Sequence, residues 1–503
     1  MRTVRHSLAA LALALSACAR PGIATSPSPR AASERAALTA FVDSLAGDAR
    51  FRNAHWGILV VDPARGDTLY SRNAGKLFMP ASNQKLLTGS TALAQLGPDY
   101  RWRTIFRTRG RGVVDGALLG DLLVEGRGDP SISDHMLKDA MIPMRAIADS
   151  LAARGVRRIT GRILPWGDAF PDSSLGWGWA WDDLNEPYSA GVEELYFNEG
   201  FTRVVVRAGA VGEAPSATTA PVAGFPAVIV EARTVARPAP ADSARPDRAR
   251  TRLVAGRTWP VEGMPGAIVV RGPILQGDSS EIEITWPDQR DAYVAALTTA
   301  LAQRGIAVEM GTTDSAMRID SLFTTASPTL REVMPILQKP SQNQIAEIFL
   351  KTLGLERTGV GTADSGRRVV ERQLVAWGAD TAGFAVRDGS GLSRHDYVTP
   401  ETIIHVLDAM RKSPDFRVFY DALPIAGVDG TIRSRMRNTP AQGNVHAKTG
   451  FVDKARSLSG YVTTADGRLL LFSMLSNNWT VPVREVERVQ DAVAVRLATL
   501  GAK

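Results

Sequence analysis

Residues 79–87 predict an α-helix that carries reactive side chains on one face. Pro80 suits a first helical turn, where its missing N–H costs no hydrogen bond. Leucines at helical spacing follow and form an apolar face until Gly97-Pro98 ends the helix. Ser82 and Lys85 are three positions apart and are therefore neighbours on that helix. The sequence thus places a hydroxyl and an amine side by side at the helix start.

This Ser-x-x-Lys pair has the parts of an activated nucleophile. A serine hydroxyl reacts poorly until a base removes its proton, and a desolvated amine can do so at neutral pH. Ser82-x-x-Lys85 is the single S-x-x-K in the chain. The alternative is an ordinary helix start with a surface lysine. Partner groups elsewhere in the chain decide between these interpretations.

Two further short motifs follow in order. Ser341-Gln342-Asn343 stands after a proline and before a helical pattern, and Lys448-Thr449-Gly450 stands on a predicted strand. Either motif alone is commonplace. The three together, in this order and these settings, resemble the signature of class A β-lactamases and penicillin-binding proteins.

Each motif side chain has a chemical reason to be there. Ser82 is the expected nucleophile that attacks a carbonyl and forms an acyl-enzyme. Lys85, kept neutral by burial and by a neighbouring cation, is the expected base. Ser341 relays the proton to the leaving amine, and the Asn343 amide holds Lys85 or the substrate backbone. Lys448 is expected to supply a fixed positive charge for a substrate carboxylate and to lower the pKa of Lys85.

Further substrate contacts are expected along the same strand. Thr449 adds a hydroxyl for the carboxylate, and Gly450 leaves room for the substrate to lie against the strand edge. A tetrahedral oxyanion needs two backbone donors, and the candidates are the N–H groups of Ser82 and Phe451.

The interval between the Ser82 motif and the Ser341 motif is long, which argues against a class A β-lactamase. The chain resembles the D-alanyl-D-alanine carboxypeptidase/endopeptidase family, the class C low-molecular-mass penicillin-binding proteins, which carry a large inserted region. Four other segments match the same family: residues 121–130, 179–183, 388–394 and 427–431. The resemblance implies an α/β (α+β) penicillin-binding-protein and serine β-lactamase-like transpeptidase fold. Such a fold has an antiparallel sheet flanked by helices, an all-α subdomain and here a mostly β insertion.

The resemblance also implies contacts with the diamino acid of the substrate. Arg394 stands where some members bind the distal carboxylate of that residue, and Asp182 or Asp183 could meet its amino group. The alternative for Arg394 is an ordinary surface arginine in a loop. The alternative for Asp182 and Asp183 is a solvated turn that follows an aromatic cluster.

The N-terminus predicts export. Residues 1–18 have a basic start and a short apolar run, as in a signal peptide. Cys18 is the single cysteine and ends a lipobox-like sequence, so we expect it to be lipidated. The alternative is cleavage after Ala17-Cys18-Ala19, which would release a soluble protein. Residues 19–32 are expected to form a flexible linker.

The rest of the chain divides into a discontinuous catalytic domain and an insertion. Residues 33–100, with a helix capped by Ser33, and 325–503 are expected to form the catalytic domain. Residues 101–324 are expected to form the mostly β insertion, with two subdomains. Its strand candidates are 104–109, 121–125, 204–206, 227–231, 267–271 and 281–286. Residues 212–226 and 237–250 are expected to be exposed loops.

Composition excludes several function classes. The net charge of +7 is a small excess for 503 residues, and no basic block with interleaved aromatics is present, so nucleic-acid binding is not expected. The six histidines include no H-E-x-x-H, and no nucleotide fingerprint follows a strand. We therefore expect no metal and no cofactor. The expected partners are peptidoglycan stem peptides, β-lactam antibiotics as inhibitors, and a membrane through the lipid anchor alone. The oligomeric state stays open.

The sequence therefore predicts an exported serine-type D-alanyl-D-alanine carboxypeptidase of the periplasm or cell envelope, with D,D-endopeptidase action on crosslinks as a further expectation. One alternative is a β-lactamase or esterase on the same scaffold. Another is a non-catalytic cell-wall-binding lipoprotein that uses the insertion to make contacts.

Overall fold

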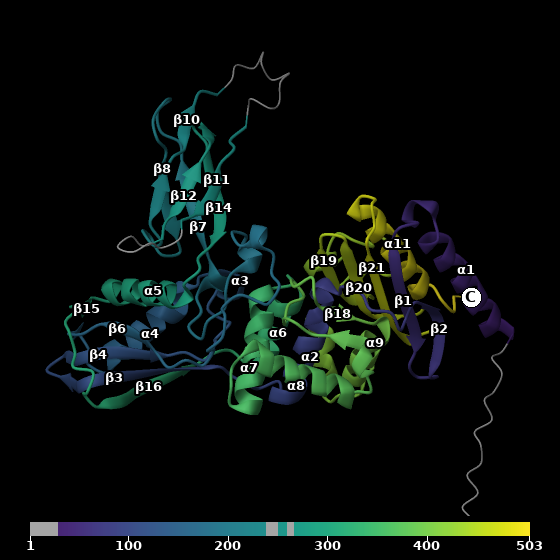
Figure 1. Cartoon of the computed structure of the whole chain (residues 1–503), viewed down its shortest axis with the longest axis horizontal. Coiled ribbons are helices and arrows are strands. Elements are labelled where there is room, and N and C mark those ends of the chain that lie inside the picture. Colours follow the sequence, from purple (N-terminus) through teal and green to yellow (C-terminus); the bar gives the residue numbers. More distant parts are fainter. Residues whose placement is uncertain (1–28, 238–249, 259–265, 503) are drawn as a thin grey trace, which may run out of the picture.

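The molecule is elongated, with a helix-covered sheet at one end and the inserted region at the other (Figure 1). The structure is a computed structural model that describes residues 29–237, 250–258 and 266–502. The predicted signal peptide and its Cys18 lie outside the described residues. Among the described residues, no helix has both the length and the apolar character needed to cross a membrane.

A five-stranded antiparallel sheet forms the centre of the catalytic part. Its strand order is β19-β20-β21-β1-β2, so the C-terminal meander pairs with the N-terminal hairpin. The strands are β1 (His55–Asp62), β2 (Asp67–Arg72), β19 (His446–Val452), β20 (Ala455–Thr463) and β21 (Leu469–Asn477). The predicted meander is confirmed.

Helices cover both faces of this sheet, which explains why its strands are apolar along their length. In β21, Leu470, Phe472 and Met474 enter the core under α1 (Pro29–Ala46) and α11 (Val483–Ala498). Leu471 and Leu475 enter the opposite core, shared with the helices on the other face. Side chains alternate between the faces of a strand, so a doubly covered strand has no polar side.

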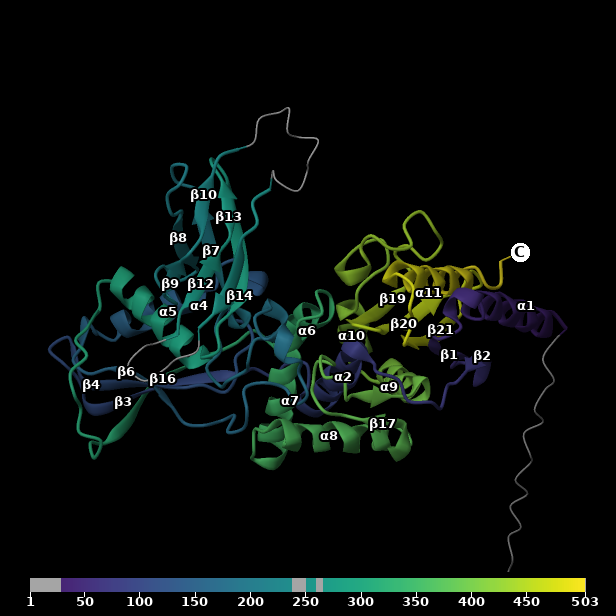
Figure 2. The same cartoon turned by 45° about the horizontal axis from the view of Figure 1, so that its top comes forward.

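The helical layer packs beside the sheet. Its central helix is α2 (Gln84–Leu96), which contacts four other helices and lies where the layer meets the sheet (Figure 2). The others are α6 (Leu330–Gln338), α7 (Asn343–Thr358), α8 (Ala363–Ala376), α9 (Pro400–Lys412) and α10 (Phe416–Ala422). A small hairpin joins β17 (Phe384–Ala385) to β18 (Tyr397–Val398). The predicted helices at 330–337 and 344–353 are confirmed as α6 and α7.

The inserted region leaves and rejoins the catalytic part through the pair β3 and β16, which are antiparallel. These strands belong to a sheet that α4 (Met141–Ala153) and α5 (Gln289–Gln303) accompany. The sheet contains β3 (Arg103–Val114), β4 (Ala117–Glu125), β5 (Arg158–Ile159), β6 (Ile163–Trp166), β15 (Ala307–Val308) and β16 (Ile319–Ala326). The short helix α3 (Asp134–Leu137) precedes α4.

Smaller sheets rise from that base as an outer lobe (Figure 1). Their strands are β7 (Phe201–Arg207), β8 (Ser216–Ala220), β9 (Val228–Val230), β10 (Arg233–Val235), β11 (Val254–Arg257), β12 (Ile268–Arg271), β13 (Pro273–Leu275) and β14 (Ser279–Thr285). All six predicted strands of the insertion lie within β3, β4, β7, β9, β12 and β14 or overlap them.

Two local expectations were wrong, and one helix was not predicted. Helix α1 begins at Pro29, ahead of the cap expected at Ser33, because proline and alanine both suit a first helical turn. The helix α4 was missed because Pro143 interrupts its apolar pattern, although proline is tolerated that early in a helix. The stretch 212–226 is not a simple loop, since β8 pairs with β7 and the neighbouring strand supplies its hydrogen bonds. Most of the loop expected at 237–250 lies outside the described residues.

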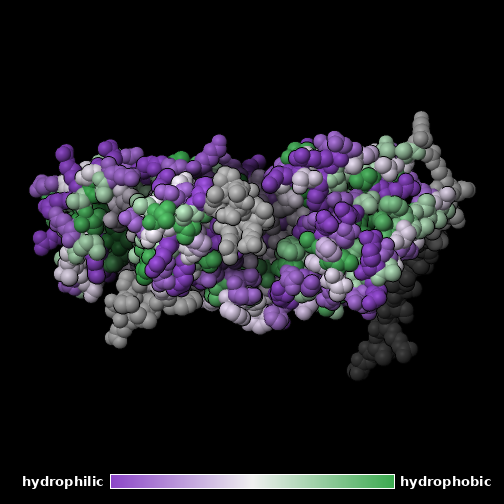
Figure 3. Space-filling view, turned by 90° about the horizontal axis from the view of Figure 1, so that it is seen from above, coloured by the Kyte–Doolittle hydropathy of each residue, from purple (hydrophilic) through white to green (hydrophobic). Residues whose placement is uncertain are grey.

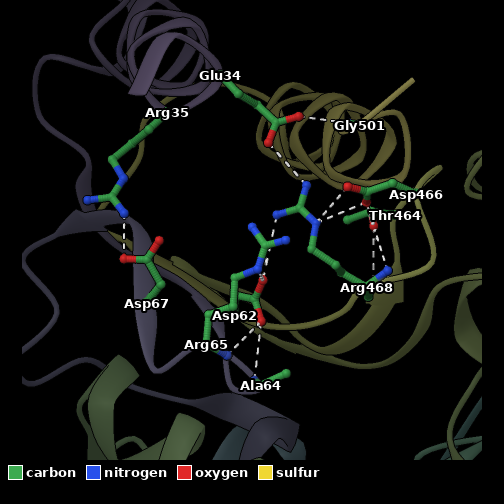
Figure 4. A network of polar contacts seen from close by, with 10 residues as sticks. All are labelled: Glu34, Arg35, Asp62, Ala64, Arg65, Asp67, Thr464, Asp466, Arg468 and Gly501. Carbon is green, nitrogen blue, oxygen red and sulfur yellow. Dashed lines mark hydrogen bonds and ion pairs between the residues drawn. The ribbon is translucent and has the colours of Figure 1, made fainter. Parts of the chain in front are cut away.

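A polar network ties α1 to the sheet and to the end of α11 (Figure 4). The guanidinium of Arg468 lies 3.1 Å from Glu34 and 3.6 Å from the fully buried carboxylate of Asp62, and it also contacts Asp466. Glu34 in turn accepts a hydrogen bond of 2.7 Å from the Gly501 N–H. Arg468 therefore joins both ends of the chain to one sheet.

The surface seen from above is mixed in character (Figure 3). Hydrophilic side chains are spread over the whole face, and hydrophobic side chains form separate patches among them, including patches near both ends.

Candidate active site

The expected helix start at Ser82 has a tighter form than a regular α-helix. Ala81–Asn83 form a 3-10 turn, and α2 begins at Gln84. Ala81 has a φ of +47°, an uncommon conformation for a residue with a side chain. Such strain persists where the surrounding structure holds it, and it is common at active sites. The turn leaves Ser82 half-buried while its neighbours are buried.

Three contacts hold this turn against the sheet. Asn83 Nδ2 donates to the Lys448 carbonyl at 2.8 Å, and Ser457 Oγ donates to the Pro80 carbonyl at 2.7 Å. Gly450 packs between them: a Cβ there would lie 2.1 Å from Ser457 Oγ and 2.9 Å from the Ser82 nitrogen. The close approach of strand and turn therefore requires glycine at position 450.

Lys85 lies at the centre of the site with no exposed surface. Its Nζ lies 2.9 Å from Ser82 Oγ, 2.6 Å from Asn343 Oδ1 and 2.8 Å from the Ser390 carbonyl oxygen. An amide oxygen and a carbonyl oxygen can only accept hydrogen bonds, whereas a hydroxyl can also donate. A neutral amine satisfies all three: two N–H groups point to the acceptors, and the lone pair faces the Ser82 hydroxyl.

Burial lowers the pKa of Lys85 from 10.5 to about 7, against the opposing effect of three carboxyl groups. Those groups belong to Asp388, Glu347 and Asp396. Lysine at this pKa is a competent base near neutral pH. Desolvation is the largest cause of the lowered pKa of Lys85, and the expected contribution of Lys448 stays a prediction.

Sequence reasoning missed the buried acids. Glu347 accepts hydrogen bonds from the backbone N–H groups of Gly389 and Ser390. Burial, and then Asp388, raise the pKa of Glu347 to about 8. Asp388 accepts from the Gly391 N–H at 2.6 Å, among other donors of its own loop. Glu347 thus holds the backbone that presents the Ser390 carbonyl to Lys85.

A signal for these acids was present. Glu347 follows Asn343 by one helical turn, so the two side chains share a face of α7. Asp388 and Asp396 flank the Gly-Ser-Gly-Leu-Ser run, where a short acid can accept from the N–H groups of a tight turn. Burial, and next the charge of Asp388, raise the pKa of Asp396 well above its usual range.

Ser341 and Lys448 form the second half of the site. Lys448 Nζ donates to Ser341 Oγ at 2.8 Å and to the Thr449 carbonyl at 3.0 Å. Ser341 has a φ of +68°, a second left-handed residue beside the reacting groups. Burial, followed by Lys85, lowers the pKa of Lys448 well below its usual range. Burial therefore disfavours the charged form of Lys448, whereas a bound anion would favour it, and the expected positive charge stays a prediction.

A segment next to the Lys448 strand aligns Thr449. The Thr431 and Thr449 hydroxyls are 2.6 Å apart, and the Thr431 N–H donates to the Lys339 carbonyl at 3.1 Å. Lys339 Nζ donates to Asp429 at 2.6 Å. These contacts connect residues 427–431 to the backbone just before Ser341.

The remaining predicted residues lie around this centre. Phe451 is half exposed on β19, and its neighbour Gly450 lies beside the Ser82 nitrogen, so both expected oxyanion donors come from adjoining segments. Arg394 is exposed, with NH1 3.4 Å from the Asp453 carbonyl. Asp183 accepts from the Tyr188 hydroxyl at 2.7 Å, and Asp182 is exposed.

The arrangement is suited to acyl transfer. A hydroxyl, the amine beside it, a second hydroxyl and a second amine lie within one set of contacts from α2, α7, β19 and the residues just before the two helices.

The comparisons with known proteins agree with this chemistry. A model of the D-Ala-D-Ala carboxypeptidase 3 (S13) family matches residues 38–500. A D-alanyl-D-alanine carboxypeptidase of Actinomadura sp. (strain R39) is 34% identical over 478 residues, which cover 91% of this chain and 84% of the relative. The D-alanyl-D-alanine carboxypeptidase DacB of Haemophilus influenzae is 25% identical over 421 residues, 81% of this chain and 82% of the relative. The crystal structure of penicillin binding protein 4 from H. influenzae matches with a TM-score of 0.75 at 22% identity, covering 91% of this chain and 99% of that one.

Proposed function

The chain belongs to the D-Ala-D-Ala carboxypeptidase 3 (S13) family, and from that premise we propose how its side chains carry out the reaction of a serine-type D-alanyl-D-alanine carboxypeptidase. The fold is the α/β fold of penicillin binding protein 4. The observation that carries the assignment of roles is the buried Lys85 amine, 2.9 Å from Ser82 Oγ, with its other neighbours acting as acceptors.

Acylation is the first half of the proposed reaction. Ser82 Oγ attacks the carbonyl carbon of the penultimate D-Ala, and its proton passes to Lys85 Nζ. The carbonyl oxygen becomes an oxyanion that the N–H groups of Ser82 and Phe451 stabilise. The C–N bond then breaks, and Ser341 passes a proton from the Lys85 side to the departing amine. The geometry supports this relay, because Asn343 holds Lys85 and Lys448 holds Ser341.

Hydrolysis is the second half. D-Ala leaves, and a water molecule attacks the ester carbon while Lys85 takes one of its protons. The ester C–O bond breaks, Ser82 recovers a proton from Lys85, and the shortened peptide departs as a carboxylic acid that gives its own proton to solvent water. No atoms beyond substrate and water are required.

Lys448, Thr449 and Gly450 are the proposed site of the terminal carboxylate. A carboxylate beside Lys448 favours the protonated amine, so the charge that burial opposes is restored when substrate binds. Thr449 is aligned by Thr431 and offers a hydroxyl to the same group. Gly450 keeps the strand edge open to an extended peptide.

The finer assignments concern substrates and location. We propose that Ser82 also reacts with β-lactams and that crosslinked stem peptides are cleaved, with Arg394 and Asp183 contacting the diamino acid at the entrance. Penicillin binding protein 4 of H. influenzae has been crystallised with a β-lactam, which supports the first part. We further propose that the protein is exported and anchored by a lipid on Cys18. The supporting feature is the basic and apolar leader with its single cysteine.

Labelling with a fluorescent penicillin tests the nucleophile. Wild type, Ser82→Ala and Ser90→Ala are compared, with intact mass and peptide mapping to locate the adduct; Ser90 is a buried serine of the same helix. We expect one adduct on wild type and on Ser90→Ala, located at Ser82, and none on Ser82→Ala. An adduct elsewhere, or none on wild type, would overturn the assignment and favour the wall-binding alternative. Rapid turnover of a chromogenic cephalosporin would favour the β-lactamase alternative.

A further inference from the structure

The inserted region contacts three consecutive residues at the start of α7, its N-cap Gln342 and its first two residues. Gln342 Nε2 donates to Glu199 Oε2. Asn343 Nδ2 donates to the Tyr188 carbonyl at 2.8 Å, and Gln344 Nε2 donates to the Pro187 carbonyl at 2.8 Å. Each partner lies more than 140 positions away in sequence, so the contacts exist because of how the insertion folds back. Here "the clamp" means these three hydrogen bonds.

The clamp decides which way the Asn343 amide faces. Its nitrogen can only donate and its oxygen can only accept. Because the Tyr188 carbonyl receives the nitrogen, the oxygen faces Lys85 Nζ at 2.6 Å. A flipped amide would place its N–H₂ against the N–H groups of the lysine and lose both bonds. The orientation of the base therefore depends on a backbone that belongs to the insertion.

Glu199 is the charged member of the clamp and is itself held rigidly. It lies in the 3-10 turn Asn198–Gly200 with 1% of its surface exposed and a φ of +54°. The Asn198 N–H donates to the Ile132 carbonyl at 2.7 Å, and the Gly200 carbonyl accepts from the Trp286 N–H at 2.9 Å. A buried carboxylate in a strained turn needs hydrogen-bond partners, because these offset the free-energy cost of removing it from water.

The partners of Glu199 come from both sides of a groove. Its Oε2 accepts from Gln342, and His135 Nδ1 lies 2.9 Å from the same oxygen. His135, Tyr188 and Glu199 line one wall of this groove, and Ser341 to Gln344 line the other. Gln342 also uses its Oε1 to accept from the Gln344 N–H at 2.8 Å, which caps α7. The Gln342 side chain thus connects the Glu199 carboxylate to the first turn of the helix that carries Asn343.

We propose that Glu199, acting through Gln342, is a positioning residue for acylation: it holds the Ser341–Gln344 loop so that Asn343 and Ser341 meet Lys85 and Lys448. The proposal rests on the proposed function, since it takes Ser82 as the nucleophile. It gives the insertion a part in the chemistry itself, in addition to any contact with substrate.

If Glu199 positions these groups, its removal should lower the rate constant for acylation of Ser82. Small displacements of catalytic groups reduce rates strongly. We expect Glu199→Ala to slow acylation of Ser82 by a penicillin by about 10- to 100-fold. Glu199→Gln keeps an oxygen acceptor for the Gln342 amide, so it should stay within about threefold of wild type. If Glu199→Gln is acylated at nearly the wild-type rate and Glu199→Ala is not, then Glu199 acts as a hydrogen-bond acceptor and its negative charge is not required.

Glu194 provides the matched control. It is also 1% exposed and lies in the same segment, but its carboxylate pairs with Arg290 of α5 instead of the active-site loop. Glu194→Ala should lower the melting temperature like Glu199→Ala while leaving acylation within about threefold of wild type. Equal losses of acylation in both variants would reduce Glu199 to a structural residue and overturn the proposal.

A double-mutant cycle with Gln342→Ala tests the proposed connection. If Glu199 acts through Gln342, the double variant should acylate no more slowly than the slower single variant. Effects that multiply would contradict the connection. If Glu199→Ala does not fold, the test uses Glu199→Gln and Gln342→Ala instead. In that case, acylation of Gln342→Ala at the wild-type rate would overturn the proposal. If wild type itself is not labelled at Ser82, the proposed function fails; if wild type is labelled and Glu199→Ala is labelled equally fast, this inference alone fails.

Discussion

At the scale of single residues, the protonation of Lys85 follows from competing effects of its surroundings. Removal from water favours the neutral amine, while Asp388, Glu347 and Asp396 favour the ammonium. The result is a pKa of about 7 instead of 10.5. The site therefore produces a base from a residue type that is charged on the surface of a protein.

The first prediction concerns pH. Because Lys85 acts in its neutral form, the acylation rate constant should rise with pH, reach half its maximum near pH 7 and level off above it. It should fall about tenfold for each pH unit below the midpoint. The measurement is the rate of Ser82 acylation between pH 5 and 9 with a penicillin that does not titrate in that range. A flat profile would contradict Lys85 as the base, and a midpoint near 10 would contradict its lowered pKa.

The second prediction concerns Glu347. The ionised form of this carboxyl raises the pKa of Lys85, and because its own pKa of about 8 leaves it only partly ionised near pH 7, Glu347→Gln should move the midpoint of that profile slightly to lower pH. The control is Glu371→Gln on α8, whose carboxylate pairs with Arg367 and should leave the midpoint unchanged. A shift to higher pH in Glu347→Gln would mean that its charge does not act on Lys85 in this direction.

At the scale of secondary-structure elements, the site depends on how closely β19 approaches the 3-10 turn before α2. The contacts between them are made by Asn83, Ser457 and the bare backbone of Gly450. Protein interiors are packed densely enough that one extra methyl group has a cost.

The third prediction follows from that approach. Gly450→Ala would place a Cβ 2.1 Å from Ser457 Oγ and 2.5 Å from the Pro80 carbonyl, so strand and turn must separate. We expect a loss of about 1–3 kcal/mol in the free energy of unfolding and a fall in acylation of at least about tenfold. Gly256→Ala is the control, since its Cβ would meet no atom within 4 Å. Normal acylation by Gly450→Ala, measured with the same penicillin, would show that the approach is not required.

The fourth prediction concerns α1 and the network of Figure 4. Arg468→Met removes one of the two arginines beside the fully buried Asp62 carboxylate, since Arg65 stays 3.7 Å away, and should lower the free energy of unfolding by about 1–3 kcal/mol. Arg35→Met, which breaks the half-exposed pair with Asp67, should cost less than about 1 kcal/mol. Urea unfolding measures both. Equal losses would contradict the role of burial, and acylation should be unchanged in either variant.

At the scale of the whole molecule, the insertion has a base that contacts the active site and an outer lobe that rises away from it (Figure 1). The base supplies Pro187, Tyr188 and Glu199 to the loop that carries Ser341. The strands of the outer lobe pair with one another. Acylation of Ser82 should therefore affect the base of the insertion more than its outer lobe.

The fifth prediction uses hydrogen exchange before and after acylation by penicillin. Exchange should slow at residues 341–344 and at 187–200, because the clamp couples these segments. The part of the outer lobe between β7 and β14 that the structure describes (208–237, 250–258 and 266–278) should change little. The Ser82→Ala variant with penicillin is the control for binding without acylation. Protection confined to the catalytic part would show that the base of the insertion does not respond.

The sequence alone determined the three motifs, their order, the helix that follows Ser82 and the C-terminal meander, because each depends on spacing between near neighbours in the chain. It also predicted that Ser82, Lys85, Ser341, Asn343 and Lys448 would act together, through a resemblance to a known family. The partners that orient these groups were decided by tertiary structure. Asn343 and Lys85 are 258 positions apart, and Glu199 and Gln342 are 143 apart. Periodicity carries no information on such pairs, and a pKa depends on burial and on the carboxyl groups that the fold brings near.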